Sequence, residues 1–314
     1  YKSEAFINSP YNSLQDLFSE RVIRGDILSS DGQVLATTKV SKDKSETREY
    51  PYGRVFAHAI GYSVNGKAGI ENQENFELLR SHEFFLKQMG ADLAGNKTQG
   101  DTVVTTFDAD VQKAAYEALG SFDGAVIAME PETGKIITMV SKPDFDPNTI
   151  KRDWETVNSD SSTALYNRAT QGKYAPGSVF KIFTALEYYR ENTKGYEDYR
   201  YDCNGSITVD GKTIHCAGNH RHGTQDLEAS FANSCNSSFA NIALTLNRNK
   251  FKELCDSMLF NKSLPIAFDS SKSSFSLSKS DTTGMVMETG IGQGKTLVSP
   301  LHMMLVASAI DNDG

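Results

Sequence analysis

One stretch near the middle of the chain constrains the fold most. The pair Pro176-Gly177 interrupts the segment before it, and an apolar run then extends from Val179 to Tyr189. The run is apolar on every side of a helix, which is typical of a helix buried inside a domain. Ser178 and Lys181 lie in the first turn of this predicted helix, and residues three apart share a helix face.

A serine and a lysine in that position have a chemical interpretation. A serine hydroxyl is a weak nucleophile until a base removes its proton. A lysine among apolar side chains has a lowered pKa and can act as that base. The helix N-terminus would favour an oxyanion that develops beside Ser178. The alternative is a capping serine followed by an ordinary lysine, since the same spacing also occurs in polar sequence at Ser41/Lys44 and Ser276/Lys279.

Length and charge narrow the class of protein. The 314 residues are enough for two domains, and 39% hydrophobic content suits a folded protein. The net charge of −8 argues against a nucleic-acid partner. The sequence contains no apolar run of about eighteen residues, so it predicts no membrane span. The chain begins with Tyr1 and not with Met, from which we expect that a preceding segment is absent.

Two domains are predicted, with a boundary near the glycines between Gly90 and Gly100. Residues 1–100 form a small mixed domain with a hairpin around Asp31-Gly32 and a helix over 71–80. Residues 101–314 begin with a strand and a helix capped by Asp108, and continue with a hairpin over 124–140. We expect the stretch 144–163 to be a loop.

The four cysteines allow two interpretations. Cys203 and Cys216 flank turn-rich sequence and are predicted to form a disulfide, which requires an oxidising compartment. The histidines around Cys216, among them His222, keep a metal site open as an alternative, but the zinc signatures Cys-x-x-Cys and His-Glu-x-x-His do not occur. We therefore expect no metal and no cofactor, and a reduced Cys235 without a partner.

A polar segment, 233–239, interrupts apolar sequence beyond the central helix. It is either a helix break satisfied by its own side chains or a loop that faces a site. In the second case Ser234 can relay a proton and the Asn236 amide can hold a substrate carbonyl. The triplet Ser-x-Asn is not specific by itself, because 63–65 matches it too.

These motifs follow one another in a known order: Ser178 to Lys181, then Ser234-Cys235-Asn236, then Gly292-Gln293-Gly294 with Ser299-Pro300. Ser-x-x-Lys with a Ser-x-Asn-type triplet is typical of penicillin-binding proteins and class A β-lactamases. The chain resembles a class B penicillin-binding protein, a peptidoglycan D,D-transpeptidase. The resemblance covers nearly the whole chain, including Arg24-Gly25-Asp26-Ile27 at the start of that family's pedestal domain.

The resemblance implies a fold and a set of roles. The fold is α+β: a transpeptidase domain with a helical subdomain and an antiparallel sheet, preceded by a small α/β pedestal of the dimerisation type. Ser178 would be acylated by a D-Ala-D-Ala stem peptide or a β-lactam, and Lys181 would take its proton. Ser234 would protonate the leaving group, and Asn236 would hold the substrate amide.

The same resemblance implies a location and a partner. An N-terminal membrane anchor would hold the domain on the outer face of a bacterial cell membrane, beside a glycan polymerase of the cell-wall machinery. The family's third motif, Lys-Thr-Gly, is not found: Lys295-Thr296 lacks the glycine and precedes the Ser299-Pro300 helix. We therefore expect the last sheet strands to follow Gly314.

Two rival functions stay open at this point. A D,D-carboxypeptidase or β-lactamase of the same fold would pass the acyl group to water instead of an amine. A non-catalytic β-lactam sensor or scaffold would keep the fold without turnover. The four intact residues of the two motifs argue against the scaffold.

Overall fold

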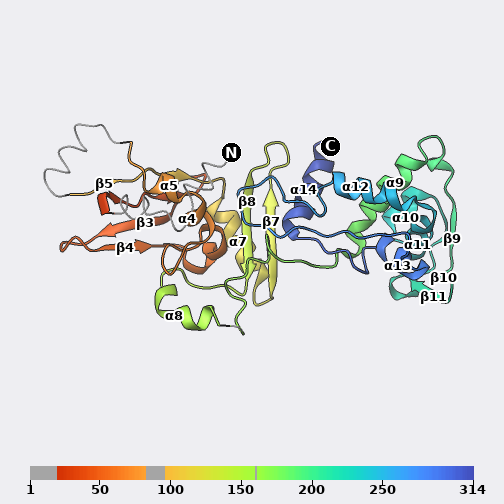
Figure 1. Cartoon of the computed structure of the whole chain (residues 1–314), viewed down its shortest axis with the longest axis horizontal. Helices are drawn as coiled ribbons and strands as arrows, with labels where there is room; N and C mark the ends of the chain where they lie inside the picture. The colour runs from red at the N-terminus through yellow and green to blue at the C-terminus, as the bar shows by residue number, and fades with distance from the viewer. Residues whose placement is uncertain (1–19, 83–95, 160) are drawn as a thin grey trace. The chain divides into compact units, whose positions relative to one another are not determined.

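The computed structural model describes residues 20–82, 96–159 and 161–314 (Figure 1). The chain divides into two compact units. Unit 1 holds the residues up to Gln171 together with Ile266–Asp269 and Met303–Gly314, and unit 2 holds Gly172–Pro265 and Ser270–His302. No helix within the described ranges is both long enough and apolar enough to cross a membrane.

Unit 1 combines short strands with short helices. Its strands are β1 (Val22–Ile23), β2 (Ile27–Leu28), β3 (Val34–Val40), β4 (Glu46–Glu49), β5 (Thr98–Gln99), β6 (Val103–Val104), β7 (Gly124–Met129) and β8 (Ile136–Lys142). Its helices are η1 (Gly53–Phe56), α3 (Ala57–Ile60), α4 (Gly69–Gln73), α5 (Asn75–Leu78), α7 (Ala109–Leu119) and α8 (Ile150–Val157).

One four-stranded sheet of unit 1 has the order β4-β3-β2-β6. β2 and β3 are antiparallel, with Ile27 opposite Ala36, and both residues are fully buried. The turn between them contains Gly32 at φ +82°, a conformation that glycine adopts without steric cost. The hairpin predicted around Asp31-Gly32 is confirmed.

A buried ion cluster holds several of these elements together. The Glu71 carboxylate of α4 is fully buried and lies 2.5 Å from Nε of Arg24 and 2.7 Å from Nε of Arg48. The hydroxyl of Tyr50 donates to the same carboxylate at 3.1 Å. The cluster therefore links α4 to β4 and to the segment between β1 and β2.

The hairpin predicted over 124–140 is confirmed as the antiparallel pair β7–β8. Asp108 caps α7 as expected, because its carboxylate accepts from the Val111 N–H at 2.9 Å. The buried Gln112 of α7 donates to the Met139 carbonyl at 2.9 Å and accepts from the Met139 N–H at 2.9 Å, which ties the helix to β8.

Two local predictions for unit 1 are wrong. The helix expected over 71–80 is divided into α4 and α5, because Glu74 leaves the helical region with φ −98° and ψ 21°. The stretch 144–163 is not all loop, since it contains α8. Ile150, Trp154 and Val157 recur at i, i+4 and i+7 and pack on one apolar cluster, a pattern that the polar composition concealed.

Unit 2 is mainly helical, with two small antiparallel pairs of strands. Its elements are η2 (Gly177–Phe180), α9 (Lys181–Glu191), η3 (Tyr196–Asp198), β9 (Tyr201–Cys203), β10 (Ser206–Val209), β11 (Lys212–His215), η4 (Ala217–Asn219), β12 (Gly223–Gln225), α10 (Leu227–Ala232), α11 (Asn236–Thr245), α12 (Arg248–Ser257) and α13 (Thr283–Gly290). The helix α14 (Pro300–Asp311) begins here, with Ser299 as its N-cap, since its Oγ accepts from the His302 N–H at 3.2 Å.

α11 lies at the centre of unit 2. It contacts α9, α13 and the β10–β11 hairpin, and these elements lie together in Figure 1. An aromatic cluster supports α9: the ring of Phe180 lies 5.0 Å from that of Phe183 and 5.8 Å from that of Phe275. Aromatic pairs at this separation add to the stability that their burial gives. The start of α9 is therefore packed into a buried aromatic cluster.

Candidate active site

Three side chains singled out from the sequence meet the amine of a fourth, Lys181, in unit 2. Nζ of Lys181 lies 3.1 Å from Oγ of Ser178 and 2.9 Å from Oγ of Ser234. The same nitrogen lies 2.8 Å from the backbone oxygen of Ser234 and 2.7 Å from Oδ1 of Asn236. The structure thus brings the Ser-x-x-Lys and Ser-x-Asn motifs together. Along the chain, Ser234 and Asn236 lie 53 and 55 positions beyond Lys181.

Lys181 is the first residue of α9, and only 1% of it is exposed. Burial lowers the pKa of its amine to about 8, although the sulfur atoms of Cys235 and Cys216 act in the opposite direction. A charged amine loses hydration when it is buried, which favours the neutral form. Lys181 therefore has a much larger uncharged fraction near neutral pH than an exposed lysine has.

Ser178 lies in the short 3-10 helix η2 that leads into α9, and it is exposed. The prediction of a helix buried on every side is wrong, because Val179 is 50% exposed and Tyr189 is 45% exposed. The run contains more apolar residues than one buried face needs, and apolar side chains are common on protein surfaces. The exposure leaves the serine hydroxyl accessible from solvent.

Gly292 supports the turn that presents Ser178, a role that the sequence did not reveal. Its backbone oxygen accepts from the Gly177 N–H at 2.8 Å. A Cβ added at Gly292 would lie 1.9 Å from the Gly177 oxygen, and Gly292 has φ +74°. The position therefore needs glycine for two independent reasons, steric and conformational. The only local sign of this role in the sequence is the alternation of glycines over 290–294, which by itself predicts no more than a turn.

The Ser-x-Asn segment joins α10 to α11. Ser234 has φ +48°, an uncommon conformation for a residue other than glycine. Asn236 begins α11, and its Nδ2 donates to the backbone oxygen of His215 at 3.0 Å. Because this bond uses the amide N–H of the side chain, Oδ1 is directed at Lys181.

The disulfide predicted between Cys203 and Cys216 is not present in this structure. Both thiols are free, and their sulfur atoms are 3.7 Å apart, whereas an S–S bond measures about 2.05 Å. Cys235, expected to have no partner, lies 3.7 Å from Cys216, and His222 Nδ1 lies 3.3 Å from Cys203. The spacing along the chain could not show that the fold brings a third cysteine and a histidine to the pair.

The two other Ser-x-x-Lys pairs of the sequence do not resemble this arrangement. Ser41 and Lys44 are both exposed, in the turn between β3 and β4. Ser276 and Lys279 are exposed in a loop of unit 2. Burial of the amine therefore separates the pair at 178 and 181 from the other two.

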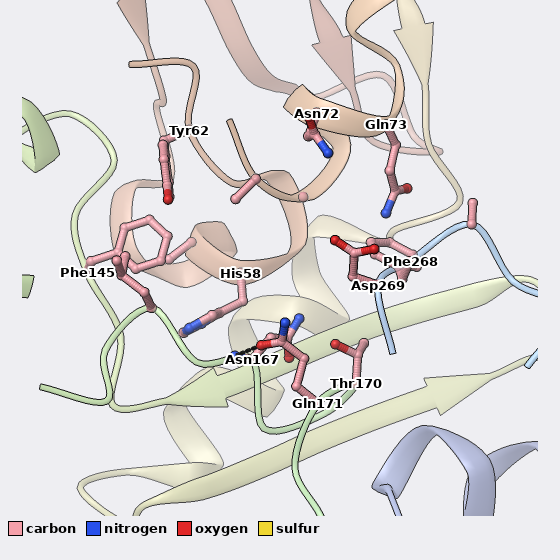
Figure 2. Close-up of a pocket in the computed structure, with 15 residues that line it drawn as sticks. His58, Tyr62, Asn72, Gln73, Phe145, Asn167, Thr170, Gln171, Phe268 and Asp269 are labelled. Carbon is pink, nitrogen blue, oxygen red and sulfur yellow. Dashed lines mark hydrogen bonds between the residues drawn. The ribbon is translucent and has the colours of Figure 1, made fainter. Parts of the chain in front are cut away.

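A small polar cavity of about 130 Å³ lies in unit 1 (Figure 2). His58 lies at this cavity, and its Nε2 donates to the Ala164 carbonyl at 2.8 Å. Burial lowers the pKa of His58 to about 4, so the ring is neutral near pH 7. Amide side chains make up much of the rest of the wall, and Oε1 of Gln171 accepts from the Asn167 N–H at 3.1 Å. The described residues that line this cavity include no nucleophile paired with a base.

Two family models match the chain. Residues 124–314 match the penicillin-binding protein transpeptidase domain. Residues 24–103 match the penicillin-binding protein A dimerisation domain. The first match alone covers more than half of the chain.

Individual relatives agree with these matches. The chain is 29% identical to peptidoglycan D,D-transpeptidase PbpA of Mycolicibacterium smegmatis over 93% of this chain and 63% of that protein. It is 27% identical to penicillin-binding protein 3 of Bacillus subtilis over 88% of this chain and 46% of that protein. The chain thus spans about half to two thirds of the length of these relatives.

A solved structure shows that the fold is also that of a penicillin-binding protein. Penicillin-binding protein A from M. tuberculosis, determined as its imipenem acyl-enzyme complex, matches with a TM-score of 0.83 and 25% identity. The match covers 95% of this chain and 72% of that chain. The α+β fold expected from the sequence is therefore confirmed, and the chain belongs to the class B penicillin-binding proteins.

Proposed function

We propose that this chain is the acyl-transfer part of a peptidoglycan D,D-transpeptidase that works through an acyl-serine intermediate. The observation that carries the proposal is the contact of Lys181 Nζ with Ser178 Oγ at 3.1 Å and with Ser234 Oγ at 2.9 Å. Two comparisons support it: a relative named as a peptidoglycan D,D-transpeptidase, and a similar structure that carries imipenem as an acyl-enzyme.

The hydrogen bonds of Lys181 show how the neutral form of the amine can act as the base. Nζ has four oxygen neighbours within 3.1 Å, and the neutral amine offers two N–H donors and one lone pair. The backbone oxygen of Ser234 and Oδ1 of Asn236 can only accept, so they take two N–H bonds. A neutral amine satisfies both and keeps its lone pair for a hydroxyl proton. In the neutral form the lone pair can accept from the Ser178 hydroxyl, whose Oγ lies 3.1 Å from Nζ.

Acylation then follows in balanced steps. The Ser178 hydroxyl transfers its proton to Lys181 Nζ while Oγ forms a bond to the carbonyl carbon of the D-Ala-D-Ala bond. The C–N bond of the substrate breaks as the tetrahedral intermediate collapses. The Ser234 hydroxyl gives its proton to the departing D-Ala nitrogen and regains one from the Lys181 ammonium, 2.9 Å away.

Deacylation reverses these proton movements with a different amine. A neighbouring stem peptide supplies the amine, which gives up a proton towards Ser234 and Lys181 as its nitrogen attacks the ester carbon. The ester C–O bond breaks, and Ser178 Oγ takes the proton back. The amide that forms is the cross-link. A β-lactam enters the first half of this sequence as a substrate mimic, and the acyl-enzyme forms when its ring amide opens.

Asn236 has a binding role in this scheme. Its Oδ1 faces the catalytic amine, and its Nδ2 donates to the His215 carbonyl. When a substrate amide enters, the side chain can exchange one of these protein partners for the peptide. The segment that carries it begins α11, so its backbone is held by the helix.

The organisation of the protein is part of the proposal. Residues 1–100 are assigned to the pedestal and residues 101–314 to the transpeptidase domain, which the matches at 24–103 and 124–314 support. The family resemblance supports a membrane anchor, a location on the outer face of the bacterial membrane, and a glycan polymerase as partner.

The test is covalent labelling of the full-length protein with a fluorescent penicillin, followed by digestion and mass mapping. We expect one adduct, on Ser178, that is lost in Ser178→Ala. Ser276→Ala is the matched control, because Ser276 belongs to an exposed Ser-x-x-Lys pair and should label normally. An adduct on another residue, or reversible binding without an adduct, would refute the acyl-serine proposal.

Product analysis separates the transpeptidase from its rivals. Stem pentapeptides with an acceptor amine should give cross-linked dimers and free D-Ala. Tetrapeptides alone would indicate a carboxypeptidase that uses water. Labelling without any turnover of the peptide would indicate a sensor.

A further inference from the structure

The polar cavity of unit 1 has side chains whose hydrogen-bonding capacity is unused. Within the described part of the chain, no protein group hydrogen-bonds to four side chains of its wall, those of Asn72, Gln73, Thr170 and Asp269. Thr170 is only 2% exposed, so bulk water hardly reaches it. Buried polar groups normally have a partner in the protein or in an ordered molecule beside it. The cavity therefore offers free donors and acceptors to an occupant.

The free groups both donate and accept. The amides of Asn72 and Gln73 each have an NH2 donor and a carbonyl acceptor, and the Thr170 hydroxyl can act in both ways. Gln171 adds a donor: its Oε1 accepts from the Asn167 N–H, and its Nε2 has no partner among the described residues. An ammonium group only donates and a carboxylate only accepts, so either would leave part of this wall unpaired. A hydroxyl group matches the wall, since it donates and accepts at one atom.

The charge of the wall also favours an uncharged ligand. No lysine or arginine is among the described residues that line the cavity, and His58 is neutral near pH 7. Asp269 brings the only formal charge of this described wall, and Figure 2 shows its carboxylate and the Gln73 amide directed into the same space. An anion buried without a cationic partner is costly, so an acidic ligand is disfavoured. The Asp269 carboxylate can accept from two hydroxyl groups of an uncharged ligand.

Aromatic rings form the apolar part of the wall. Tyr62 and Phe145 pack edge to face with ring centroids 5.5 Å apart, and Phe268 also lines the cavity. A sugar ring has hydroxyl groups at its edge and C–H groups on its faces, so it needs polar and apolar surface together. The volume of about 130 Å³ is smaller than the roughly 300 to 1,000 Å³ of pockets that enclose a drug-sized ligand. The cavity therefore suits one ring-sized unit of a longer molecule.

We propose that this cavity binds one uncharged sugar residue of a polysaccharide, with the side chains of Asn72, Gln73 and Thr170 paired to its hydroxyl groups. For a peptidoglycan transpeptidase, this polysaccharide is the glycan strand that carries the stem peptides. The identification with the glycan strand rests on the function proposed above, whereas the saccharide site does not.

The wall combines residues from both matched domains, all within unit 1. Asn72 and Gln73 belong to α4, inside the match to the dimerisation domain at 24–103. Thr170 and Asp269 lie inside the match to the transpeptidase domain at 124–314. A bound sugar therefore bridges the two domains. It also holds the glycan strand at a second point, in addition to the stem peptide at Ser178.

The first experiment uses Trp154, the single tryptophan of these 314 residues, as a reporter. Its ring lies 5.8 Å from that of Tyr62, which lines the cavity. The full-length protein is titrated with a tetramer of N-acetylglucosamine while tryptophan fluorescence is recorded. We expect a saturable change, and calorimetry should give the same Kd. In Trp154→Phe the fluorescence change should be lost while calorimetry still records binding.

Substitutions assign the binding to this cavity. Thr170→Val removes the hydroxyl at nearly constant volume, and Gln73→Leu removes an amide. Each should weaken binding of the tetramer about two- to tenfold, the range that one hydrogen bond contributes. Neither side chain has a partner among the described residues, so both variants should fold normally. Gln99→Leu is the matched control, because Gln99 is exposed in β5 and does not line the cavity. Unchanged affinity in Thr170→Val and Gln73→Leu would overturn the assignment.

Competing ligands test the class of molecule without any variant. A stem pentapeptide without sugar should not displace the tetramer. Displacement by the pentapeptide, or no saturable binding of the tetramer to the unmodified protein, would overturn the saccharide site.

The source of the sugar has its own test. Purified glycan strands without peptides should displace the tetramer, and failure to do so would overturn the glycan-strand identification and leave the saccharide site standing. If penicillin does not acylate the protein, the proposed function fails, and the titration still decides the saccharide site.

Discussion

Nζ of Lys181 and Oδ1 of Asn236 are 2.7 Å apart, the shortest of the contacts that the amine makes. The other end of the same amide is held by the His215 carbonyl, so the side chain bridges the start of α9 and the end of β11. An amide in this position accepts from the amine without adding charge. The contact therefore fixes the orientation of Lys181 without the rise in its pKa that a carboxylate would cause.

The first prediction concerns the base. Lys181→Met keeps the volume of the side chain but removes its lone pair, so the acylation rate should fall about a hundred- to ten-thousandfold, the range that a general base contributes. Stopped-flow labelling with penicillin measures the rate. Lys279→Met, at the exposed second motif, should acylate like the unmodified protein. A Lys181→Met rate within tenfold of that control would rule out Lys181 as the base.

The second prediction is a pH dependence. Burial lowers the pKa of Lys181 to about 8, and the neutral amine is the active form. The acylation rate should therefore rise about tenfold per pH unit below 8 and level off above it. The rate is measured from pH 6 to 10 at saturating and at limiting penicillin. A rate that is constant across this range would mean that the proton leaves Ser178 by another route.

The third prediction concerns the midpoint of the pH–rate curve, the pH at which acylation reaches half of its maximal rate. A substitution at Asn236 should move this midpoint. In Asn236→Asp a carboxylate replaces Oδ1 beside Nζ, and an opposite charge favours the protonated amine. The midpoint of the pH–rate curve should shift above 8. Asn236→Ser removes the amide without adding charge, so its rate should fall with no upward shift. If both variants shift alike, the charge at this position does not control the amine.

The fourth prediction tests the close approach at Gly292. Gly292→Ala combines a left-handed backbone with a Cβ only 1.9 Å from the Gly177 oxygen. Gly294→Ala has a similar φ, +77°, but its Cβ would lie 3.7 Å from the nearest atom. The backbone strain costs about 1 to 3 kcal/mol in either variant, and overpacking adds about 1 to 3 kcal/mol at Gly292 alone.

Urea unfolding of both variants separates the free-energy cost of overpacking at Gly292 from the cost of backbone strain, which both variants share. The difference between the two losses of unfolding free energy should be at least about 1 kcal/mol. Gly292→Ala should also slow acylation more than Gly294→Ala does, because the turn it disturbs precedes Ser178. Equal losses in the two variants would show that the segment moves aside without cost.

Local chemistry explains what the sequence could predict. Asp108 caps α7 and Ser299 caps α14 through contacts within a few residues, so both helix starts could be found from the sequence. The hairpins at 31–32 and 124–140 are equally local. Motif order was enough to indicate the family and the residues that meet at Lys181.

Contacts between distant segments explain what was missed. Gly292 must be glycine because of Gly177, a residue more than a hundred positions earlier, and nothing around Gly292 shows this. The cysteine cluster depends on how β9, β12 and α11 meet, so a pairing chosen from spacing alone took two of its members and omitted Cys235. The exposure of Val179 likewise depends on what covers the helix and not on its own sequence.

The last prediction concerns the buried carboxylate of Glu71. Burial alone would raise the pKa of this group, but the charges of Arg24 and Arg48 outweigh it and the pKa is lowered. Glu71→Ala leaves two guanidinium groups without their counter-charge, and breaking a buried pair in this way costs about 3 to 5 kcal/mol of unfolding free energy. Glu49→Ala is the control, because its ion pair with Lys39 is exposed and should contribute less than about 1 kcal/mol.

The lowered pKa of Glu71 also fixes the sign of an acid effect. A carboxyl group whose folded-state pKa lies below its unfolded value of about 4.3 stabilises the fold above that pH, and its contribution is lost as the pH falls towards the folded-state value. The difference in unfolding free energy between unmodified protein and Glu71→Gln should therefore be constant near neutral pH and shrink below about pH 4. Urea unfolding at several pH values measures it. A difference that grows on acidification would mean that Glu71 is protonated in the folded protein and that the two arginines do not hold its charge.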